Sequence, residues 1–554
     1  MAVDERIDEE GAGSAGRDGS AAGIIGVLGA GTMGAGIAQL ACRAGAQTLL
    51  HDPIPEALEK GVEKVHDGLR REAAKGRLSA QEAQEAAERL QPVAAMQSLA
   101  PSELVIEAVP ERLALKHELY ASLSQIVAED CVLASNTSSI LVTAIAAAAT
   151  RPERVVGMHF FNPAPVMRLV EVIAGVRSGE RALALAHATG EAMGKTVIRA
   201  HDGPGFLVNR CNRPFGLEAL RLLSERIGDI ETIDRICRMQ GAFPMGPFEL
   251  MDLVGVDTGF EVALSFYEQS FGEPRWRPSP IAARQVAAGL NGRKSGRGYY
   301  DYREGGSYRA EDPPPPESGA GEGVVVIAGS LPIAAELRAG AAAAGYRVIG
   351  PETSLGDELP SLFIDCDPVA TREGTQAGAR PRHRAPGGAH LVLCAEGSLG
   401  TLDPLGSAVG FHLLPPLTAA GLVELTRTSS SSPVAAQRAE RFFAVLGLHA
   451  AWVADAPGLV LGRIVCQVIN EAAFALGEGV GSARDIDLGM VLGLSHPRGP
   501  LEWAEAIGLD HVLAVLDALS DHYREERYRA APLLRTLVGE DRLGGARGEA
   551  FAQV

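Results

Sequence analysis

Three features are missing from this sequence, and each absence excludes a class of protein. Its seven cysteines include no Cys-x-x-Cys pair, so we expect neither a disulfide framework nor a metal site, and this usage is typical of a reducing cytoplasm. No run of about 18 apolar residues occurs, so we expect no transmembrane helix. The net charge of −18 argues against nucleic acid and anionic membranes as partners. An anionic ligand would need a local cluster of cations.

The length of 554 residues is too great for one hydrophobic core, so several domains are expected. After Gly23, short apolar runs alternate with stretches of helical pattern, which is typical of a parallel, doubly wound sheet. One of the predicted helical stretches is charged and extends over about 55–90. Amphipathic stretches then predict an all-helical domain, a segment rich in Pro, Gly and Glu predicts a linker, and the alternation resumes. The first residues are acidic and rich in Gly and Ala, without the apolar core of a signal peptide, which predicts a disordered leader. The predicted parts are the leader (1–22), a Rossmann domain (23–202), a helical domain (203–302), the linker (303–322), a degenerate Rossmann-like domain (323–454) and a second helical domain (455–554).

The second half of the chain repeats the spacing of the first. The gaps between five marker positions are 12, 31, 7 and 35 residues in both halves, which indicates an internal duplication. The markers are His159, Glu171, Asp202, Asn209 and Pro244 in the first half, and His412, Glu424, Asp455, Gly462 and Pro497 in the second. Since Gly462 stands where the first half has the polar Asn209, we expect a working site in the first half and a degenerate one in the second.

A predicted strand is joined to a predicted helix by the motif Gly29-Ala30-Gly31-Thr32-Met33-Gly34. The glycines permit a tight turn, close approach of a pyrophosphate and close packing of helix on strand, while the helix N-terminus offers N–H groups to the phosphates. The motif alone is also compatible with a simple glycine-rich turn. Asp52 ends the next predicted strand, where a carboxylate accepts hydrogen bonds from the ribose 2′-OH of NAD and repels the 2′-phosphate of NADP. The equivalent segment of the second half, Val326–Pro332, has one glycine and a proline, so we expect no dinucleotide there.

Four polar residues after the glycine motif have the properties of a dehydrogenase site. His159 is suited to take a hydroxyl proton near neutral pH, and Glu171 behind it would fix the tautomer and stabilise the imidazolium. Ser138 and Asn209 would hold the substrate oxygen as an alcohol becomes a ketone. Each residue has an ordinary structural alternative, as a loop histidine, a satisfied buried carboxylate, or a cap or turn residue. Their joint presence after a dinucleotide motif favours catalysis.

Six segments resemble 3-hydroxyacyl-CoA dehydrogenases, and the resemblance extends from residue 23 to about residue 302. The segments are GVLGAGTMGAGIAQ, SNTSS, GMHFFNPAPVMRLVEV, DGPGFLVNR, PMGPFELMDLVGVD and GRKSGRGYYDY. The resemblance implies NAD-dependent oxidation of an L-3-hydroxyacyl-CoA to the 3-oxoacyl-CoA, with His159 and Glu171 as base and orienting acid. It also implies that Ser138 and Asn209 contact the substrate oxygen. The NAD contacts that it implies are Gly29, Gly31, Gly34, Asp52, Glu111, Lys116, Ser138, Asn162 and Lys294.

Long two-copy members of the family include enzymes for 3-hydroxybutyryl-CoA and 3-hydroxyadipyl-CoA in fatty-acid or aromatic (phenylacetate) catabolism. Similar enzymes place coenzyme A contacts in the charged stretch after Asp52, although a solvated helix of mixed charge is the simpler interpretation of that stretch. Its cations are Lys60, Lys64, Arg70, Arg71, Lys75 and Arg77.

Short members of the family pair through their helical domains. We therefore expect the second helical domain to pack on the first as an intramolecular pseudo-dimer, and we leave open a further homodimer of whole chains. Two other functions remain open. One is an NAD-dependent dehydrogenase of a hydroxy or sugar acid without coenzyme A, and the other is a non-catalytic dinucleotide-binding or structural protein.

Overall fold

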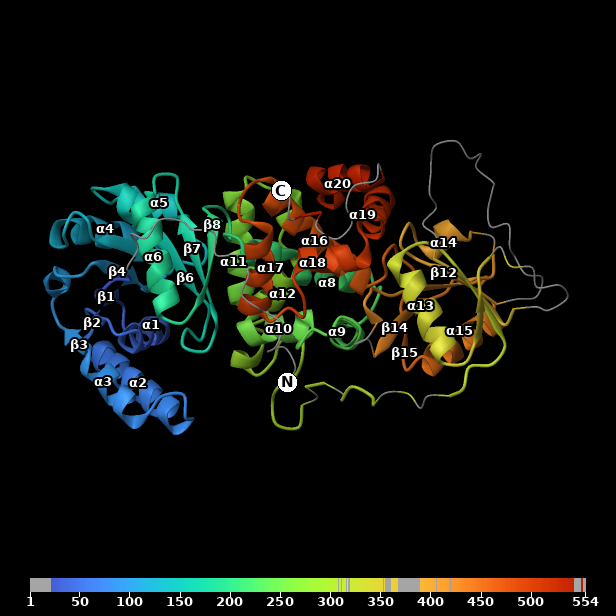
Figure 1. Ribbon diagram of the computed structural model, residues 1–554, viewed down its shortest axis with the longest axis horizontal. Helices are drawn as coiled ribbons and strands as arrows, with labels where there is room; N and C mark the ends of the chain where they lie inside the picture. Colours follow the sequence, from blue (N-terminus) through green and yellow to red (C-terminus); the bar gives the residue numbers. More distant parts are fainter. Residues whose placement is uncertain are drawn as a thin grey trace. The chain divides into compact units, whose positions relative to one another are not determined.

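The computed structural model describes residues 21–306, 308–309, 311–314, 316, 319–351, 353, 360–366, 389–404, 406–417, 421–542 and 550–551 (Figure 1). The chain forms two compact units, one ending at Val197 and the other beginning at Ile198. Most of the predicted leader, residues 1–20, lies outside the described residues. Ala22 is already buried, and its backbone N–H donates to Thr189 Oγ1 at 3.2 Å. The division into six parts stays a prediction.

The first unit contains the expected doubly wound sheet, in the strand order β3-β2-β1-β4-β5-β6-β7-β8. Neighbours from β3 to β6 are parallel, and β6 and β7 are antiparallel. The central strands are buried almost throughout because helices cover both faces. The strands are β1 (Ile24–Leu28), β2 (Gln47–His51), β3 (Leu90–Val93), β4 (Leu104–Glu107), β5 (Val132–Ser135), β6 (Val155–Phe160), β7 (Leu169–Ala174) and β8 (Thr196–His201).

The charged stretch predicted over 55–90 is helical but broken. Gly76 has a φ of +70°, which ends the first helix, and Ser79 caps the second by accepting from the Glu82 N–H at 3.1 Å. The helices of this unit are α1 (Thr32–Arg43), α2 (Pro55–Ala74), α3 (Ala80–Glu88), α4 (Leu113–Ile126), α5 (Val142–Ala146) and α6 (Glu180–Ala192).

The second unit contains a second sheet in the order β10-β9-β11-β12-β13-β14-β15. Among the described residues, this is the order of the first sheet without a counterpart of β3, and its β13 and β14 are likewise antiparallel. Its strands are β9 (Val324–Ala328), β10 (Arg347–Ile349), β11 (Leu362–Asp365), β12 (Ala389–Leu393), β13 (Val409–His412), β14 (Leu422–Thr426) and β15 (His449–Trp452). The helices between these strands are α13 (Pro332–Ala343), α14 (Leu399–Leu402) and α15 (Pro433–Val445).

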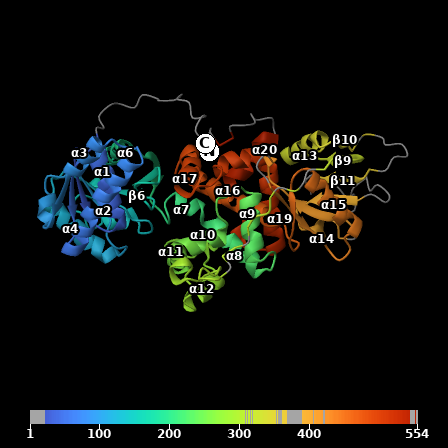
Figure 2. The same ribbon diagram turned by 90° about the horizontal axis from the view of Figure 1, so that it is seen from below.

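Helices from before and after this second sheet pack together in the same unit. The helix α16 (Leu461–Gly477) is buried along nearly its whole length, and it contacts α7, α8 and α19 (Figure 2). Helices before the second sheet are α7 (Val208–Cys211), α8 (Arg213–Ser224), α9 (Ile230–Met239), α10 (Pro247–Val254), α11 (Val256–Gln269) and α12 (Pro280–Ala287). Those after it are α16, α17 (Ala483–Leu494), α18 (Pro500–Ile507), α19 (Leu509–Tyr523) and α20 (Pro532–Arg542). None of the helices in the described ranges is long and apolar enough to span a membrane.

Ion pairs between the two sets of helices are reciprocal. Arg210 Nε lies 2.8 Å from Glu471 Oε1, and Arg463 Nε lies 2.8 Å from Glu218 Oε2. Arg463 follows Gly462 as Arg210 follows Asn209, and Glu471 lies at the position of Glu218 in the duplicated numbering. Each copy thus gives its arginine to the other copy's glutamate, which is the pattern of a two-fold, self-complementary interface.

Candidate active site

The glycine motif forms the turn between β1 and α1. Gly29 has a φ of +98°, and a Cβ on it would lie 2.7 Å from the Ala108 carbonyl oxygen. A Cβ on Gly34 would lie 1.8 Å from the Gly29 oxygen, so both positions require glycine. A Cβ on Gly31 would meet nothing within 4 Å, and Gly31 caps the N-terminus of α1 ahead of Thr32 and Met33. The turn therefore has an open side at a helix N-terminus, which fits a pyrophosphate.

Asp52 lies immediately beyond the end of β2 and contacts this turn. Its Oδ2 accepts from the Ala30 N–H at 2.9 Å, and its Oδ1 accepts from the Ile54 N–H at 3.0 Å. These bonds fix the carboxylate at the carboxyl edge of the sheet, beside the glycine turn. The donor and acceptor set fits the adenosine end of a dinucleotide.

A buried network supports the loop that carries Ser138. Lys116 Nζ donates to both carboxylate oxygens of Glu107, at 2.7 and 2.9 Å, and lies 3.3 Å from Glu111 Oε2. Glu111 Oε1 in turn accepts from the Ser138 N–H at 2.9 Å and from Thr137 Oγ1 at 2.6 Å. Glu111 is thus a support for the Ser138 loop as well as a predicted NAD contact.

Two features of this network bear on the sequence predictions. Burial raises the pKa of the Glu111 carboxyl, but Lys116 and the hydrogen bonds from the serine loop more than offset that effect, and the pKa lies below its usual value. Glu107, which ends the apolar run of β4, was missed from the sequence. The signal that could have found it is a carboxylate at the carboxyl end of a buried parallel strand.

His159 and Glu171 face each other on neighbouring antiparallel strands. They are directly paired in the register of β6 and β7, and His159 Nδ1 lies 2.6 Å from Glu171 Oε2. Glu171 is fully buried and His159 is 7% exposed. The Asn136 side chain, from the serine loop, accepts from the Phe160 N–H at 2.8 Å and ties that loop to β6. The arrangement can fix one tautomer of the imidazole.

The remaining predicted site residues lie further along the chain. Asn162 follows β6 and is exposed. Asn209, on α7, is half-buried and belongs to the second unit, as does Lys294. Lys294 Nζ lies 2.6 Å from Asp257 Oδ1 and 3.3 Å from Thr258 Oγ1. The roles of these three residues stay predictions.

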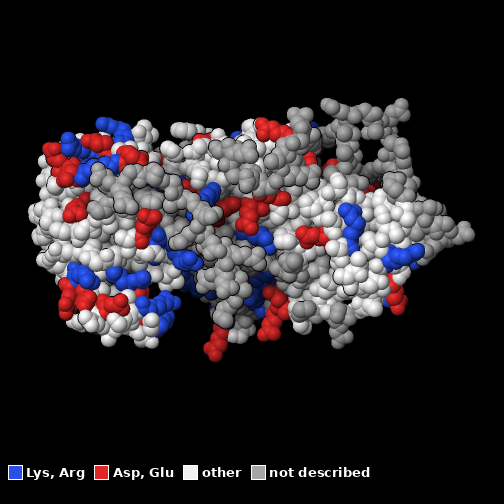
Figure 3. Space-filling view, in the orientation of Figure 1, with Lys and Arg blue, Asp and Glu red and all other residues white. Residues whose placement is uncertain are grey.

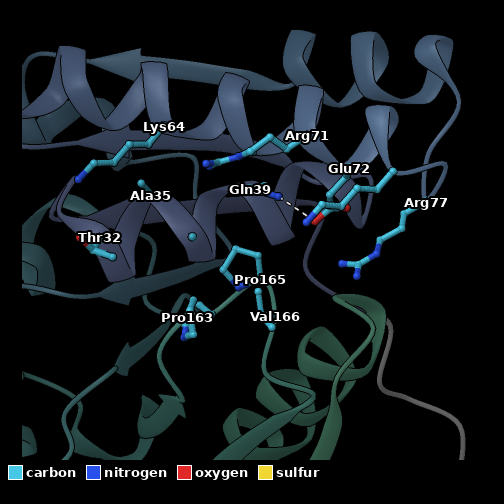
Figure 4. Close-up of a pocket in the computed structure, with 14 residues that line it drawn as sticks. Thr32, Ala35, Gln39, Lys64, Arg71, Glu72, Arg77, Pro163, Pro165 and Val166 are labelled. Atoms are coloured by element: carbon cyan, nitrogen blue, oxygen red, sulfur yellow. Dashed lines mark hydrogen bonds between the residues drawn. The ribbon is translucent and has the colours of Figure 1, made fainter. Parts of the chain in front are cut away.

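Cations line a cavity of about 530 Å³ between α1, α2 and the segment Pro163–Val166 (Figure 4). Lys64, Arg71, Lys75 and Arg77 contribute to it, while Glu72 is held by Gln39 Nε2 and Arg43 Nη1, both at 2.9 Å. Arg70 instead pairs with Asp67 on its own helix. On the surface of α2 and α3, Lys and Arg are interspersed with acidic side chains (Figure 3). The excess of positive charge is therefore confined to the lining of the cavity.

The second copy places its histidine and glutamate differently. His412 and Glu424 are again directly paired in register, on β13 and β14. Glu424, however, accepts from the Val460 and Leu461 N–H groups at 2.6 and 3.0 Å, at the start of α16. His412 Nδ1 has no hydrogen-bond partner within the described ranges, and its Nε2 lies 3.2 Å from His511 Nε2.

The imidazole of His412 also occupies the space of the missing polar side chain. A Cβ on Gly462 would lie 2.1 Å from His412 Cε1. Burial and His511 hold the pKa of His412 well below its usual value, and burial raises the pKa of Glu424 to about 8. Both groups are therefore held neutral near pH 7, as expected of a structural pair. The described residues contain no cluster of His, Cys, Asp or Glu suited to a metal ion.

Comparisons with known proteins agree with this architecture. The sequence profile described as "3-hydroxyacyl-CoA dehydrogenase, NAD binding domain" matches residues 24–203, and that of the C-terminal domain matches residues 205–302 and 458–554. The chain is 36% identical to 3-hydroxyadipyl-CoA dehydrogenase of Escherichia coli over 92% of its own length and 96% of the relative's. It is 40% identical to a probable 3-hydroxybutyryl-CoA dehydrogenase of Bacillus subtilis over 50% of its own length and 96% of the relative's.

A solved structure extends the likeness to both copies. The crystal structure of a 3-hydroxybutyryl-CoA dehydrogenase from Escherichia coli matches with a TM-score of 0.79 at 33% identity, and the match covers 95% of this chain and 100% of that one. The glycine turn, the paired His159 and Glu171 and the repeated architecture therefore occur in a chain that matches known relatives over more than nine-tenths of its length. The chain belongs to the 3-hydroxyacyl-CoA dehydrogenase family, with one NAD-binding domain and two copies of the family's C-terminal domain.

Proposed function

We propose that this chain oxidises the hydroxyl group of an L-3-hydroxyacyl-CoA to a ketone, with NAD as the cofactor. Family membership over the full architecture supports the reaction, and the observation that carries the site is the 2.6 Å contact between His159 and Glu171. When bound, NAD supplies the hydride acceptor. The glycine turn and Asp52 would hold its pyrophosphate and adenosine ribose.

His159 is proposed as the base for the substrate hydroxyl proton. The contact with Glu171 implies that Nδ1 carries a proton and donates it to the carboxylate, so Nε2 is the nitrogen that accepts the substrate proton. Glu171 lies in a fully buried position, where its negative charge stabilises the imidazolium that forms. Ser138 and Asn209 are proposed to donate to the substrate oxygen, which gains negative charge as its proton leaves.

The further NAD contacts proposed from the family pattern are Glu111, Lys116, Asn162 and Lys294. Lys116 is almost fully buried against Glu107, so its contribution on this chain is to fix Glu111 and the serine loop. The exposed Asn162 and half-exposed Lys294 have side chains that can reach a bound molecule. The KM for NAD should be higher in the N162A and K294A variants. In K116A, both a higher KM for NAD and a lower melting temperature are expected.

We propose that the cation-lined cavity of the first unit binds the phosphates of coenzyme A. Four cationic side chains line this cavity of about 530 Å³. They supply the local positive charge that a net-acidic chain needs to bind a phosphate-bearing ligand. The alternative, a hydroxy or sugar acid without coenzyme A, predicts that these cations have no effect on turnover. An Arg71→Glu, Arg77→Glu double variant should raise the KM for acetoacetyl-CoA but leave the KM for NADH unchanged. An unchanged KM for both would show that these cations do not hold coenzyme A, whereas equal turnover of a 3-hydroxy acid without coenzyme A would favour the alternative.

The acyl group and the pathway are finer proposals. The relatives act, by their names, on 3-hydroxyadipyl-CoA and 3-hydroxybutyryl-CoA, which supports a short acyl chain or a dicarboxylic one. A role in fatty-acid or phenylacetate catabolism, in the cytoplasm, is proposed from the family resemblance alone. The test is an NADH-linked assay with 3-hydroxyacyl-CoAs of increasing length and one dicarboxylic substrate. Turnover of none of them would contradict the proposed function.

We also propose that the two helical parts form an internal pseudo-dimer, and the reciprocal pairs of Arg210 and Arg463 support it. A fragment of residues 1–302 should then be insoluble, inactive or dimeric. A soluble, monomeric and fully active fragment would contradict the proposal.

A further inference from the structure

The short helix that carries Asn209 is held mainly by the second copy. α7 has only four residues, and a helix of that length is not stable by itself. It contacts α16 and α17, both from the second copy. A Cβ on Gly489 would lie 2.7 Å from Val208 Cγ2, and a Cβ on Gly481 would lie 2.7 Å from Leu207 Cδ2. The side chains of the two residues before Asn209 therefore pack closely on glycine positions of that copy.

Arg210, the next residue after Asn209, is anchored by two carboxylates of α16 and its C-cap. Its Nε lies 2.8 Å from Glu471 Oε1, and its Nη2 lies 2.7 Å from Glu478 Oε2. The other oxygen of Glu471 accepts from Arg275 Nη1 at 2.9 Å, so this 2% exposed carboxylate joins two buried arginines. Removing the charge of Glu471 would leave both arginines without a full counter-charge, which is costly in a buried position.

A third contact fixes the other end of α7. His496 Nε2 lies 3.0 Å from Oδ1 of Asn212, the C-cap residue, and its ring contacts Phe215 and Phe243. Burial lowers the pKa of His496 to about 4, so a neutral imidazole donates this bond near pH 7. Asn209 is thus followed by an ion pair at the next residue and by a hydrogen bond three residues on.

The duplication provides a matched arrangement without an asparagine. Arg463 pairs with the corresponding Glu218 and Glu225 of the first copy, at 2.8 and 2.6 Å, and it also donates to the hydroxyl groups of Tyr523 and Tyr528. The residue before Arg463 is Gly462, which has no side chain to orient. The two sets of ion pairs therefore have the same structural duty, but only the set around Arg210 adjoins a predicted substrate contact.

We propose that the second copy positions Asn209 for the substrate oxygen, with Glu471, Glu478 and His496 as positioning residues. The inference rests on the proposed function, in which Asn209 donates to that oxygen. It gives the second copy a part in the reaction, although that copy lacks the three-glycine turn, and its His412 contacts His511 while its Glu424 bonds to the start of α16. A displacement of about 1 Å at such a donor can cost about 100-fold in rate, so a modest shift of α7 is sufficient.

The test compares pseudo-symmetric variants of the whole chain, Glu478→Gln with Glu225→Gln and Glu471→Gln with Glu218→Gln. The assay is reduction of acetoacetyl-CoA by NADH, with kcat, KM, NADH affinity and melting temperature measured for each variant. We expect E478Q and E471Q to lower kcat about tenfold or more, with NADH affinity unchanged. We expect E225Q and E218Q to lower the melting temperature by at least as much, because Glu225 accepts from both Arg463 and Tyr523, but to leave kcat within about twofold.

A double-mutant cycle with Asn209→Ala separates positioning from general destabilisation. If Glu478 acts through Asn209, E478Q should lower kcat little further in the N209A background. Glu478→Asp, which keeps the charge, should recover part of the kcat. Equal effects of E478Q and E225Q on kcat, or full additivity with N209A, would overturn the inference. Glu478 is 49% exposed, so this pair stays measurable even where E471Q fails to fold. A wild-type chain inactive on every acyl-CoA would instead contradict the proposed function, and the inference with it.

Discussion

A histidine and a glutamate are paired on corresponding antiparallel strands of both copies, but their surroundings differ between the copies. In the first copy, His159 and Glu171 contact each other at 2.6 Å. In the second copy, Glu424 accepts hydrogen bonds from backbone N–H groups at the start of α16. The imidazole of His412 contacts His511 and packs on Gly462. Strand register alone therefore does not make a catalytic pair. What decides the chemistry is whether neighbouring helices offer the histidine and the carboxylate other partners.

The largest expected difference between the copies comes from replacing the histidines. His159→Ala should lower kcat by about 10²–10⁴-fold, because it removes the proposed base. His412→Ala should keep kcat within about twofold but lower the melting temperature, because it leaves a cavity over Gly462 and removes the partner of His511. NADH-linked kinetics and thermal unfolding measure the two effects. A comparable loss of kcat in both variants would mean that both copies take part in the chemistry.

The second-largest difference between the copies is expected from replacing the glutamates. Glu171→Gln removes the negative charge behind the imidazole and should lower kcat about 100-fold or more. Glu424→Gln should keep kcat at pH 7 within about twofold, because Glu424 bonds to the start of α16 and not to a catalytic histidine. It should lower the melting temperature, because the amide nitrogen cannot accept the backbone N–H bond that one carboxyl oxygen accepts. Kinetics and thermal unfolding at pH 7 with both variants test this contrast, and a comparable loss of kcat in E424Q would contradict it.

A substitution in the glycine turn should have a smaller effect, and only on cofactor binding. Gly31→Leu introduces the residue that the second copy has in Leu331, at a position where a Cβ meets nothing and φ is −66°. The fold should be retained, and the KM for NAD should rise about tenfold or more because the side chain blocks the helix N-terminus. NADH fluorescence titration and the melting temperature separate binding from folding. The control is Leu331→Gly, which should gain no binding, since Pro332 still begins α13. An unchanged KM in G31L would place the cofactor elsewhere.

The smallest effect is on the pH dependence of stability and comes from the second copy. Burial lowers the pKa of His511 to about 4, below the unfolded value of about 6.5, so the unfolded chain binds more protons between these pH values. His511 should therefore contribute stability at pH 7 that is lost as the pH falls toward 4, on the order of 2–3 kcal/mol. His511→Gln should reduce the acid-induced loss measured by urea unfolding at pH 7 and pH 5. A variant with the same pH dependence as the wild type would contradict this assignment.

Much of the fold followed from local patterns in the sequence. The glycine motif, the alternation of apolar runs with helices and the repeated spacing predicted the doubly wound sheet and its degenerate copy. These signals are local because a turn requires glycine and a buried strand requires apolar residues, wherever the chain then goes. The His159 and Glu171 pair was predicted from the chemistry of a base with an orienting carboxylate and from the family resemblance, and the antiparallel register of β6 and β7 brings the two residues together.

Tertiary contacts account for what the sequence did not predict. Glu107 and Lys116 form a buried pair only because β4 and α4 bring them together. The turn of Glu424 toward α16 depends on a helix start 36 residues later in the chain. The reciprocal pairs of Arg210 and Arg463 cross about half the sequence, with separations of 261 and 245 residues from Glu471 and Glu218. No periodicity or short motif encodes such partners.

The central claim is that one copy binds the cofactor and performs the chemistry while the other supports it. Calorimetric titration of the whole chain with NADH tests this claim most directly. The account predicts one NADH per 554-residue chain, with binding weakened by Gly31→Leu and retained in His412→Ala. Two NADH per chain, or a single site that Gly31→Leu leaves intact, would contradict it.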